Sequence, residues 1–196
     1  IKLEPASPFT WASGWKSPIY CDNRITLSYP QICSIIRDKY VSTIEKHYPR
    51  ANIIAGVATG GIAQAALIAD VLDLPMVYVR SSAKKHGREN LVEGELQPNS
   101  KIVVIEDLIS TGGSSLKAVN ALREAGSEVV GMIATFTYGF DIAEQNFARE
   151  AVPLHTLTHY QALLEAALEN NYISKQDLSL LEQWRKDPAN WKGKLQ

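Results

Sequence analysis

Residues 101–115 constrain the fold more than any other stretch of the chain. They begin with an apolar, β-branched run that ends in two neighbouring carboxylates, Glu106 and Asp107. A loop of small residues follows, and from Leu116 onward apolar residues recur at helical spacing. This order predicts a buried strand, a loop and the N-terminus of a helix.

The predicted loop, from Ser110 to Ser114, suits a phosphate group. Its small side chains leave the backbone N–H groups accessible, and the following helix directs the positive end of its dipole toward them. The carboxylates before the loop cannot bind a phosphate, but they suit sugar hydroxyls or a Mg²⁺ ion beside it. The pattern favours a site for a phosphorylated sugar over the alternative, an ordinary strand–helix turn with solubilising acids.

Two common phosphate-binding loops do not fit this stretch. A P-loop requires Gly-x-x-x-x-Gly-Lys-Ser/Thr, and no lysine follows Gly112 and Gly113. The Gly-x-Gly-x-x-Gly fingerprint of dinucleotide-binding proteins is also absent. The phosphate-binding loop therefore belongs to a different class.

The composition bounds the class of protein. A length of 196 residues is typical of one domain, and a net charge of −1 gives no electrostatic footprint for nucleic acid or an anionic membrane. Cys21 and Cys33 have neither metal-binding nor disulfide-framework spacing, which favours a reduced, cytoplasmic protein. No apolar run approaches the roughly 20 residues that a membrane helix needs, and no signal peptide is visible.

Apolar runs and helical periodicities alternate along the rest of the chain. They predict an α/β fold with a mainly parallel central sheet flanked by helices, in a single domain over residues 1–196. Residues 1–28 are expected to form an arm or hood, about 50–157 the α/β core, and 158–196 the C-terminal helices. Besides the central strand, strands are expected at about 53–57, 76–79, 128–138 and 153–157, and helices at about 29–48, 60–72, 141–150, 160–168 and 175–184.

The strand, the acid pair and the Thr-Gly loop at residues 106–114 resemble the signature of the type I phosphoribosyltransferases. A second motif lies in the arm, where residues 9–14 precede Lys16, Ser17 and Pro18. This arm is similar to the N-terminal signature of the orotate phosphoribosyltransferase family, in which it belongs to a hood that covers the base. The resemblance spans about residues 9 to 140.

A basic loop, residues 81–90, follows the strand that ends at Arg80. It resembles the catalytic loop of the same family, with Arg80, Lys84 and His86 at the matching positions, and a mobile lid over an anion is expected. The alternative is an ordinary solvated surface loop. Ser81 stands where some relatives carry another lysine.

A second strand–glycine loop–helix unit lies at residues 53–72. The resemblance places a diphosphate-binding loop at residues 58–63, whereas close helix–sheet packing is the alternative reading of its glycines. Gly60 stands where some members carry a lysine, so only backbone contacts are expected. Tyr138 lies in the region where some relatives place an arginine for the base carboxylate, so that contact is not expected either.

The resemblance implies a transfer of the 5-phosphoribosyl group from 5-phosphoribosyl-1-diphosphate to orotate in pyrimidine biosynthesis, with Mg²⁺ bound mainly through the substrate. It implies catalytic roles for Lys84, His86 and Asp107. It implies orotate contacts from Ser110 and, more weakly, from Tyr20 and Lys16. The implied contacts with the phosphoribosyl donor are Arg80, Lys84, Lys85, His86, Glu106, Asp107, Leu108, Ile109, Ser110, Thr111, Gly112, Gly113 and Ser114.

Members of this family are dimers, so the resemblance also implies a homodimer with active sites shared across the two-fold axis. Two other functions stay open: a phosphoribosyltransferase for another base, and a regulatory protein that binds phosphoribosyl compounds on the same fold. The arm motif argues against the first, and the basic loop around Lys84 and His86 argues against the second.

Overall fold

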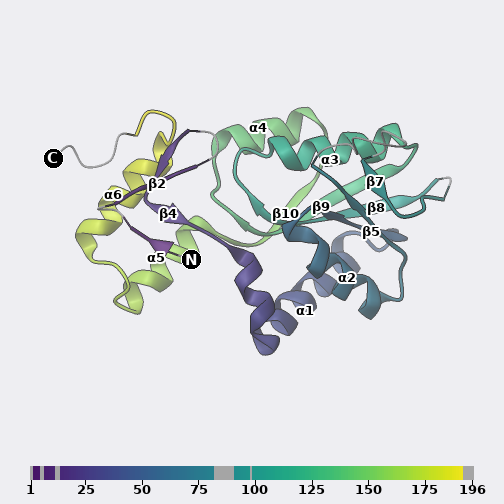
Figure 1. The fold of residues 1–196 in the computed structure, drawn as a ribbon, viewed down its shortest axis with the longest axis horizontal. Helices are drawn as coiled ribbons and strands as arrows, with labels where there is room; N and C mark the ends of the chain where they lie inside the picture. The colour runs from purple at the N-terminus through teal and green to yellow at the C-terminus, as the bar shows by residue number, and fades with distance from the viewer. Residues whose placement is uncertain (1, 5–6, 12–13, 82–90, 98, 192–196) are drawn as a thin grey trace. The chain divides into compact units, whose positions relative to one another are not determined.

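The computed structural model describes residues 2–4, 7–11, 14–81, 91–97 and 99–191 (Figure 1). The chain divides into two compact units. The larger unit is Arg24–Leu157, and the smaller one joins Ile1–Asn23 to Thr158–Gln196. Among the described residues, no helix has both the length and the apolar character that a bilayer crossing requires.

The larger unit is built on a six-stranded sheet with the strand order β10-β9-β8-β5-β6-β7. β5 pairs in parallel with β6 and with β8, β8 pairs in parallel with β9, and the short edge strand β7 is antiparallel to β6. This confirms the predicted α/β fold with a mainly parallel sheet. The strands are β5 (Ile53–Val57), β6 (Met76–Val79), β7 (Val92–Glu93), β8 (Lys101–Ile109), β9 (Glu128–Thr137) and β10 (Leu154–His159).

Helices cover both faces of this sheet (Figure 1). The helices α1 (Pro30–His47) and α2 (Gly60–Leu72) pack on one face, and α3 (Gly113–Glu124) and α4 (Asp141–Arg149) pack on the other. The central strand β8 is buried between them, so its side chains alternate between two apolar clusters. Val103 and Ile105 face α1 and α2, whereas Ile102 and Val104 face α3.

β8 is longer than its apolar run suggests. Instead of ending at the carboxylates, the strand continues through them to Ile109. Its pairs with β5 run from Ile53↔Ile102 to Gly56↔Ile105, whereas its pairs with β9 continue to Ile109↔Thr137. The acid pair therefore lies on a strand segment that extends beyond β5.

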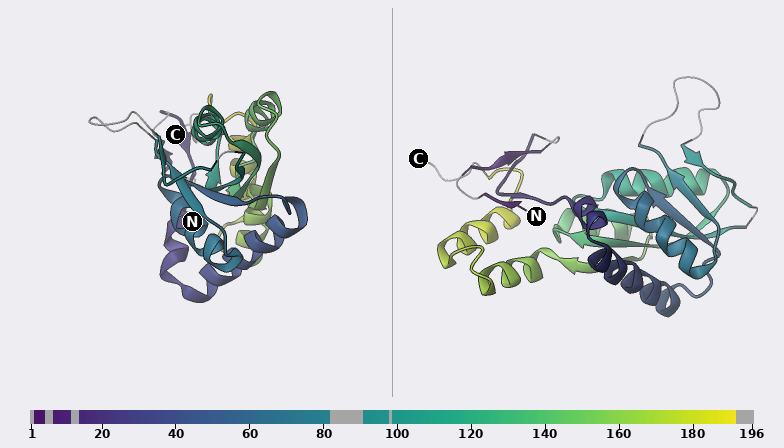
Figure 2. Two further views of the ribbon diagram at one scale, coloured as in Figure 1. Left: turned by 90° about the vertical axis from the view of Figure 1, so that its right-hand side faces the viewer. Right: turned by 60° about the horizontal axis from the view of Figure 1, so that its bottom comes forward.

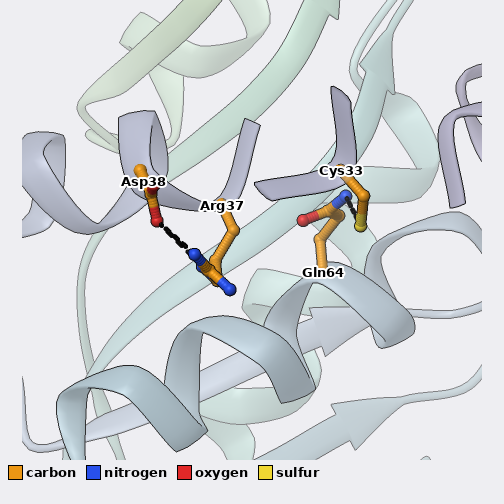
Figure 3. Close-up of polar contacts among 4 residues, drawn as sticks. All are labelled: Cys33, Arg37, Asp38 and Gln64. Atoms are coloured by element: carbon orange, nitrogen blue, oxygen red, sulfur yellow. Dashed lines mark hydrogen bonds and ion pairs between the residues drawn. The ribbon is translucent and has the colours of Figure 1, made fainter. Parts of the chain in front are cut away.

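α1 and α2 contact each other through polar as well as apolar side chains (Figure 3). The side-chain amide of Gln64 on α2 donates to Cys33 Sγ on α1 at 3.6 Å. The Oε1 atom of Gln64 is buried and has no hydrogen-bond partner among the described residues. Nearby on α1, Arg37 and Asp38 form an ion pair at 2.7 Å.

The smaller unit joins the two ends of the chain (Figure 2). Trp184 is fully buried, its indole N–H donates to the carbonyl of Lys16 at 3.0 Å, and its ring meets Trp11 edge-on at 5.6 Å. A capping box at Ser174 begins the last helix. The elements here are the antiparallel pairs β1 (Lys2–Leu3) with β4 (Ile19–Tyr20) and β2 (Phe9–Thr10) with β3 (Lys16–Ser17), and the helices α5 (Tyr160–Glu169) and α6 (Lys175–Lys186); the 3₁₀ helix η1 (Asn23–Ser28) leads into the larger unit.

Candidate active site

The phosphate loop connects β8 to α3, as the sequence predicts. Gly112 is the residue before α3 and has a φ of +81°, a left-handed conformation that disfavours any residue with a side chain. A Cβ there would also lie 2.7 Å from the Phe147 ring. The side-chain amide of Asn146 on α4 donates to the carbonyl of Thr111 at 2.9 Å. The hydrogen bond from Asn146 and the Phe147 ring thus hold the loop from the side of α4. The loop leads directly into α3, a helix of 12 residues.

Glu106 is the buried member of the acid pair, with 5% of its surface exposed. Its carboxylate accepts two hydrogen bonds, one from the N–H of Asp107 at 3.0 Å and one from Ser115 Oγ at 2.9 Å. Burial raises the pKa of Glu106 above its ordinary value, and the neighbouring Asp107 carboxylate raises it further. Glu106 is therefore easier to protonate than a free carboxyl, and its charge depends on its hydrogen-bond donors.

Asp107 is the next residue of β8, and its carboxylate interacts with that of Glu106. Its carboxylate lies against the α-carbon of Gly60, so closely that a Cβ at Gly60 would overlap it. A side chain at position 60 would require Asp107 to move. The Asp107 side chain therefore meets the second glycine loop directly.

That second loop connects β5 to α2. The Ala58–Thr59 peptide bond is cis, and α2 begins at Gly60. Gly61 packs against the backbone of β8, where a Cβ would overlap the carbonyl oxygen of Ile105. The glycines thus allow close helix–sheet packing, and they also bring the start of α2 beside Asp107. Close packing does not rule out diphosphate binding by this loop, which stays a prediction.

Arg80 follows β6 and is held in two ways. Its N–H donates to the carbonyl of Leu91 at 2.9 Å, and its guanidinium lies 3.4 Å from the Glu93 carboxylate. A cavity of about 380 Å³ opens beside it, with Ala58 of the second loop, Ser114 of the phosphate loop and Lys117 of α3 in its lining. Arg80 and Lys117 thus line the same cavity as residues of both loops.

The other predicted site residues differ in how exposed their side chains are. Ile109 is fully buried in β8, so its backbone alone can contact a ligand, whereas Ser114 is exposed at the start of α3. Lys84, Lys85 and His86 lie outside the described residues. The remaining donor-loop residues, Leu108, Ser110, Thr111 and Gly113, lie on or directly after the carboxyl end of β8.

The two weaker orotate candidates lie in the smaller unit. Tyr20 is 44% exposed, and Lys16 donates through its ammonium group to Thr10 Oγ1 at 2.7 Å. Tyr138, at the end of β9, is buried and stacks on Phe140 with an interplanar angle of 11°. Tyr138 is therefore a core aromatic residue and does not replace the arginine that some relatives carry in this region.

Sequence reasoning missed two residues of this region, Ser115 and Lys117. Ser115 is buried and donates to Glu106, although the expected phosphate loop stopped one residue earlier. The available signal was its position on the apolar stripe of α3, where a serine needs a hydrogen-bond partner. Lys117 gave no such signal, because a single lysine on an exposed helix face is usually solvated.

A sequence profile of the phosphoribosyl transferase domain matches residues 27–153. This range contains both glycine loops, the acid pair and Arg80. The chain therefore belongs to the phosphoribosyltransferases.

Comparison with individual proteins narrows the class. The chain is 60% identical over 191 residues to an orotate phosphoribosyltransferase of Bacteroides fragilis, covering 97% of this chain and 90% of that protein. It is 62% identical to an orotate phosphoribosyltransferase of Porphyromonas gingivalis, covering 97% and 91%. The crystal structure of orotate phosphoribosyltransferase from Aeropyrum pernix is similar, with a TM-score of 0.75, 30% identity and coverage of 85% of this chain and 92% of that one. The chain belongs to the orotate phosphoribosyltransferase family.

Proposed function

We propose that the protein transfers the 5-phosphoribosyl group from 5-phosphoribosyl-1-diphosphate to orotate, giving orotidine 5′-monophosphate and diphosphate in de novo pyrimidine biosynthesis. The observation that carries this proposal is the identity of 60% to orotate phosphoribosyltransferases across nearly the whole chain. The geometry supports it, because a phosphate loop, an acid pair and a second glycine loop meet at the carboxyl end of β8.

In this reaction the 5′-phosphate binds the N–H groups and hydroxyls of residues 110–114, at the positive end of the α3 dipole. The ribose hydroxyls bind the acid pair, with Asp107 on the side of the second loop and Glu106 on the side of α3. The diphosphate then lies toward Gly60 and Arg80. The donor then lies along the carboxyl edge of the sheet, with its 5′-phosphate at one loop and its diphosphate at the other. Its anomeric carbon stays accessible to the base.

The bond between the anomeric carbon and the diphosphate breaks early, which leaves positive charge on the ribose. A ring nitrogen of orotate attacks that carbon and gives up its proton, and the departing diphosphate carries away the bonding electron pair and takes up a proton in its place. Cations near the diphosphate stabilise this separation of charge, and we assign this role to Arg80, Lys84 and Lys85. His86 is assigned as a proton donor to the diphosphate. Orotate is assigned to Ser110, with Tyr20 and Lys16 as further contacts.

Mg²⁺ is the cofactor that this chemistry implies, because it neutralises diphosphate oxygens as a Lewis acid. The described residues contain no group of three or more His, Cys, Asp or Glu side chains that could hold a metal ion. Mg²⁺ commonly binds through one or two carboxylates plus substrate phosphates, and Asp107 at the second loop fits that arrangement. Asp107 is therefore the residue that we assign to the ion, together with the substrate itself.

We also propose that the enzyme is a cytoplasmic homodimer in which the basic loop of one subunit serves the site of the other. The test mixes inactive Lys84→Ala protein with inactive Asp107→Asn protein and allows the subunits to exchange. If the loops act across the interface, each heterodimer contains one intact site and activity returns. Subunit exchange confirmed by mass spectrometry without recovered turnover would show that each subunit uses its own loop.

The function itself is tested by a spectrophotometric assay of orotate consumption with the donor and Mg²⁺. Turnover of orotate, with adenine, hypoxanthine and uracil as inactive controls, is the expected result. Turnover with another base alone would assign a different acceptor. Donor binding without turnover of any base would indicate a regulatory phosphoribosyl-binding protein.

A further inference from the structure

A buried tyrosine of α1 contacts the backbone of the acid pair. Tyr40 is fully buried, and its hydroxyl lies 2.7 Å from the carbonyl oxygen of Glu106 and 2.8 Å from the hydroxyl of Thr135 on β9. A tyrosine hydroxyl has one proton and a carbonyl can only accept, so Tyr40 donates to Glu106 and Thr135 donates to Tyr40. The chain of two hydrogen bonds links α1, β8 and β9.

The position of this contact along β8 is what makes it informative. The last pair between β5 and β8 is Gly56↔Ile105, so Glu106 is the first residue beyond that ladder. β9 pairs with β8 at this level, through Glu106↔Ala134, and Thr135 is the next residue of β9. Tyr40 therefore supplies a fixed donor at the point where β8 loses one of its two neighbours and where the two carboxylates begin.

We propose that Tyr40 is a positioning residue for the acid pair: its hydroxyl fixes the β8 backbone at Glu106, so that Glu106 and Asp107 keep the orientation that binds the ribose of the donor. This inference rests on the proposed function. Tyr40 acts through the backbone of Glu106, because its buried hydroxyl is occupied by protein partners. Burial also raises the pKa of Tyr40, so the hydroxyl keeps its proton and remains a donor throughout the working pH range.

A purely structural role is the competing explanation, and the chain offers a matched control. Tyr160 in the smaller unit is also buried, and its hydroxyl donates to a backbone carbonyl, that of Leu181, at 3.2 Å. Tyr160→Phe therefore removes the same group from another buried position without touching β8. Both substitutions keep the aromatic ring and remove one hydrogen bond to a backbone carbonyl, so both should lower the thermal unfolding midpoint.

The experiment compares wild type, Tyr40→Phe and Tyr160→Phe in the full-length protein. Calorimetry measures the affinity for the donor with Mg²⁺, and steady-state kinetics measure its KM and the kcat. For Tyr40→Phe we expect kcat/KM to fall about tenfold or more and donor affinity to weaken about fivefold, since misplacement by an ångström can cost on the order of a hundredfold. For Tyr160→Phe both quantities should stay within about twofold of wild type.

Equal kinetics in the two variants would overturn the proposal. Thr135→Val is a second variant that keeps the bond from Tyr40 to the Glu106 carbonyl but removes the Thr135 hydroxyl that donates to Tyr40. It should weaken binding of the phosphoribosyl donor less than Tyr40→Phe does. If Tyr40→Phe fails to fold, wild-type donor affinity in Thr135→Val counts against the proposal and weakened affinity supports it. Failure of the proposed function can be told apart from failure of the Tyr40 proposal. In the first case the wild type would bind the donor without consuming orotate, and the calorimetric comparison of the variants would still decide the role of Tyr40.

Discussion

Replacing Gly61 by alanine is the sharpest test of how the second glycine loop is positioned. The added Cβ would overlap the carbonyl oxygen of Ile105 and lie 3.1 Å from its carbonyl carbon. Carbon atoms in contact normally lie about 3.5–4.0 Å apart. Since the obstructing atoms are backbone atoms of the central strand, α2 and β8 must separate locally by an amount on the order of 1 Å. The start of α2 then moves relative to Asp107.

This displacement should affect turnover more than it affects stability. Overpacking of this kind typically costs about 1–3 kcal/mol of unfolding free energy. A shift of about 1 Å in groups that hold a substrate can lower the rate by about a hundredfold. We therefore expect Gly61→Ala to remain folded and to lose about two orders of magnitude in kcat/KM for the phosphoribosyl donor, measured by orotate consumption and by urea denaturation of the same samples.

Gly126→Ala is the matched control. Gly126 has a φ of +85° and has no atom within 4 Å of an added Cβ, and it lies between α3 and β9, away from the phosphate loop. Its substitution should cost about 1–2 kcal/mol through backbone strain alone and leave the kinetics unchanged. If Gly61→Ala kept wild-type kcat/KM, or lost no more of it than Gly126→Ala, the close approach of α2 to β8 would not be what positions the site.

Three further predictions concern other residues of the larger unit. Gln64→Met should raise the free energy of unfolding by about 1 kcal/mol in urea denaturation without changing turnover, because it removes a buried amide oxygen that has no partner among the described residues; a loss of stability would contradict this. Burial lowers the pKa of His155, and the charges of His47 and Lys46 lower it further. The unfolded chain therefore binds the proton more readily, and the free energy of unfolding should fall as the pH drops below about 6.5. His155→Gln should reduce this pH dependence in urea denaturation between pH 7 and pH 5, and an unchanged slope would refute the assignment. Ser115→Ala removes the hydroxyl that lowers the pKa of Glu106, so the acid limb of the pH profile of donor binding should move to higher pH, and an unmoved limb would mean that Glu106 does not titrate in that step.

Much of the fold and part of the site could be predicted because their signals are local. The apolar run before Glu106, the small residues after it and the helical spacing from Leu116 onward are contiguous, and the structure confirms that strand–loop–helix unit. The bounds of α1, α5 and α6 also agree with the expected helices to within two residues. Each of these elements depends on periodicity within a short window.

What the sequence did not reveal depends on contacts between distant parts of the chain. The bond from Trp184 to the Lys16 carbonyl joins residues 168 positions apart, and the bond from Tyr40 to Glu106 joins residues 66 apart. The extension of β8 to Ile109 was missed for a different reason. Carboxylates and small polar residues have low strand propensity, and pairing with β9 overrides that propensity here.

The contact between Asp107 and Gly60 gives a physical reason for a glycine at position 60. A lysine at position 60 would add a cation where the proposed reaction places the diphosphate, but any side chain there would overlap the Asp107 carboxylate in its present position. Glycine therefore allows the acid to reach the start of α2, at the cost of that cation. In the proposed reaction, positive charge for the diphosphate comes from Arg80 and the basic loop, and Lys117 lines the same cavity as Arg80 beside the two loops.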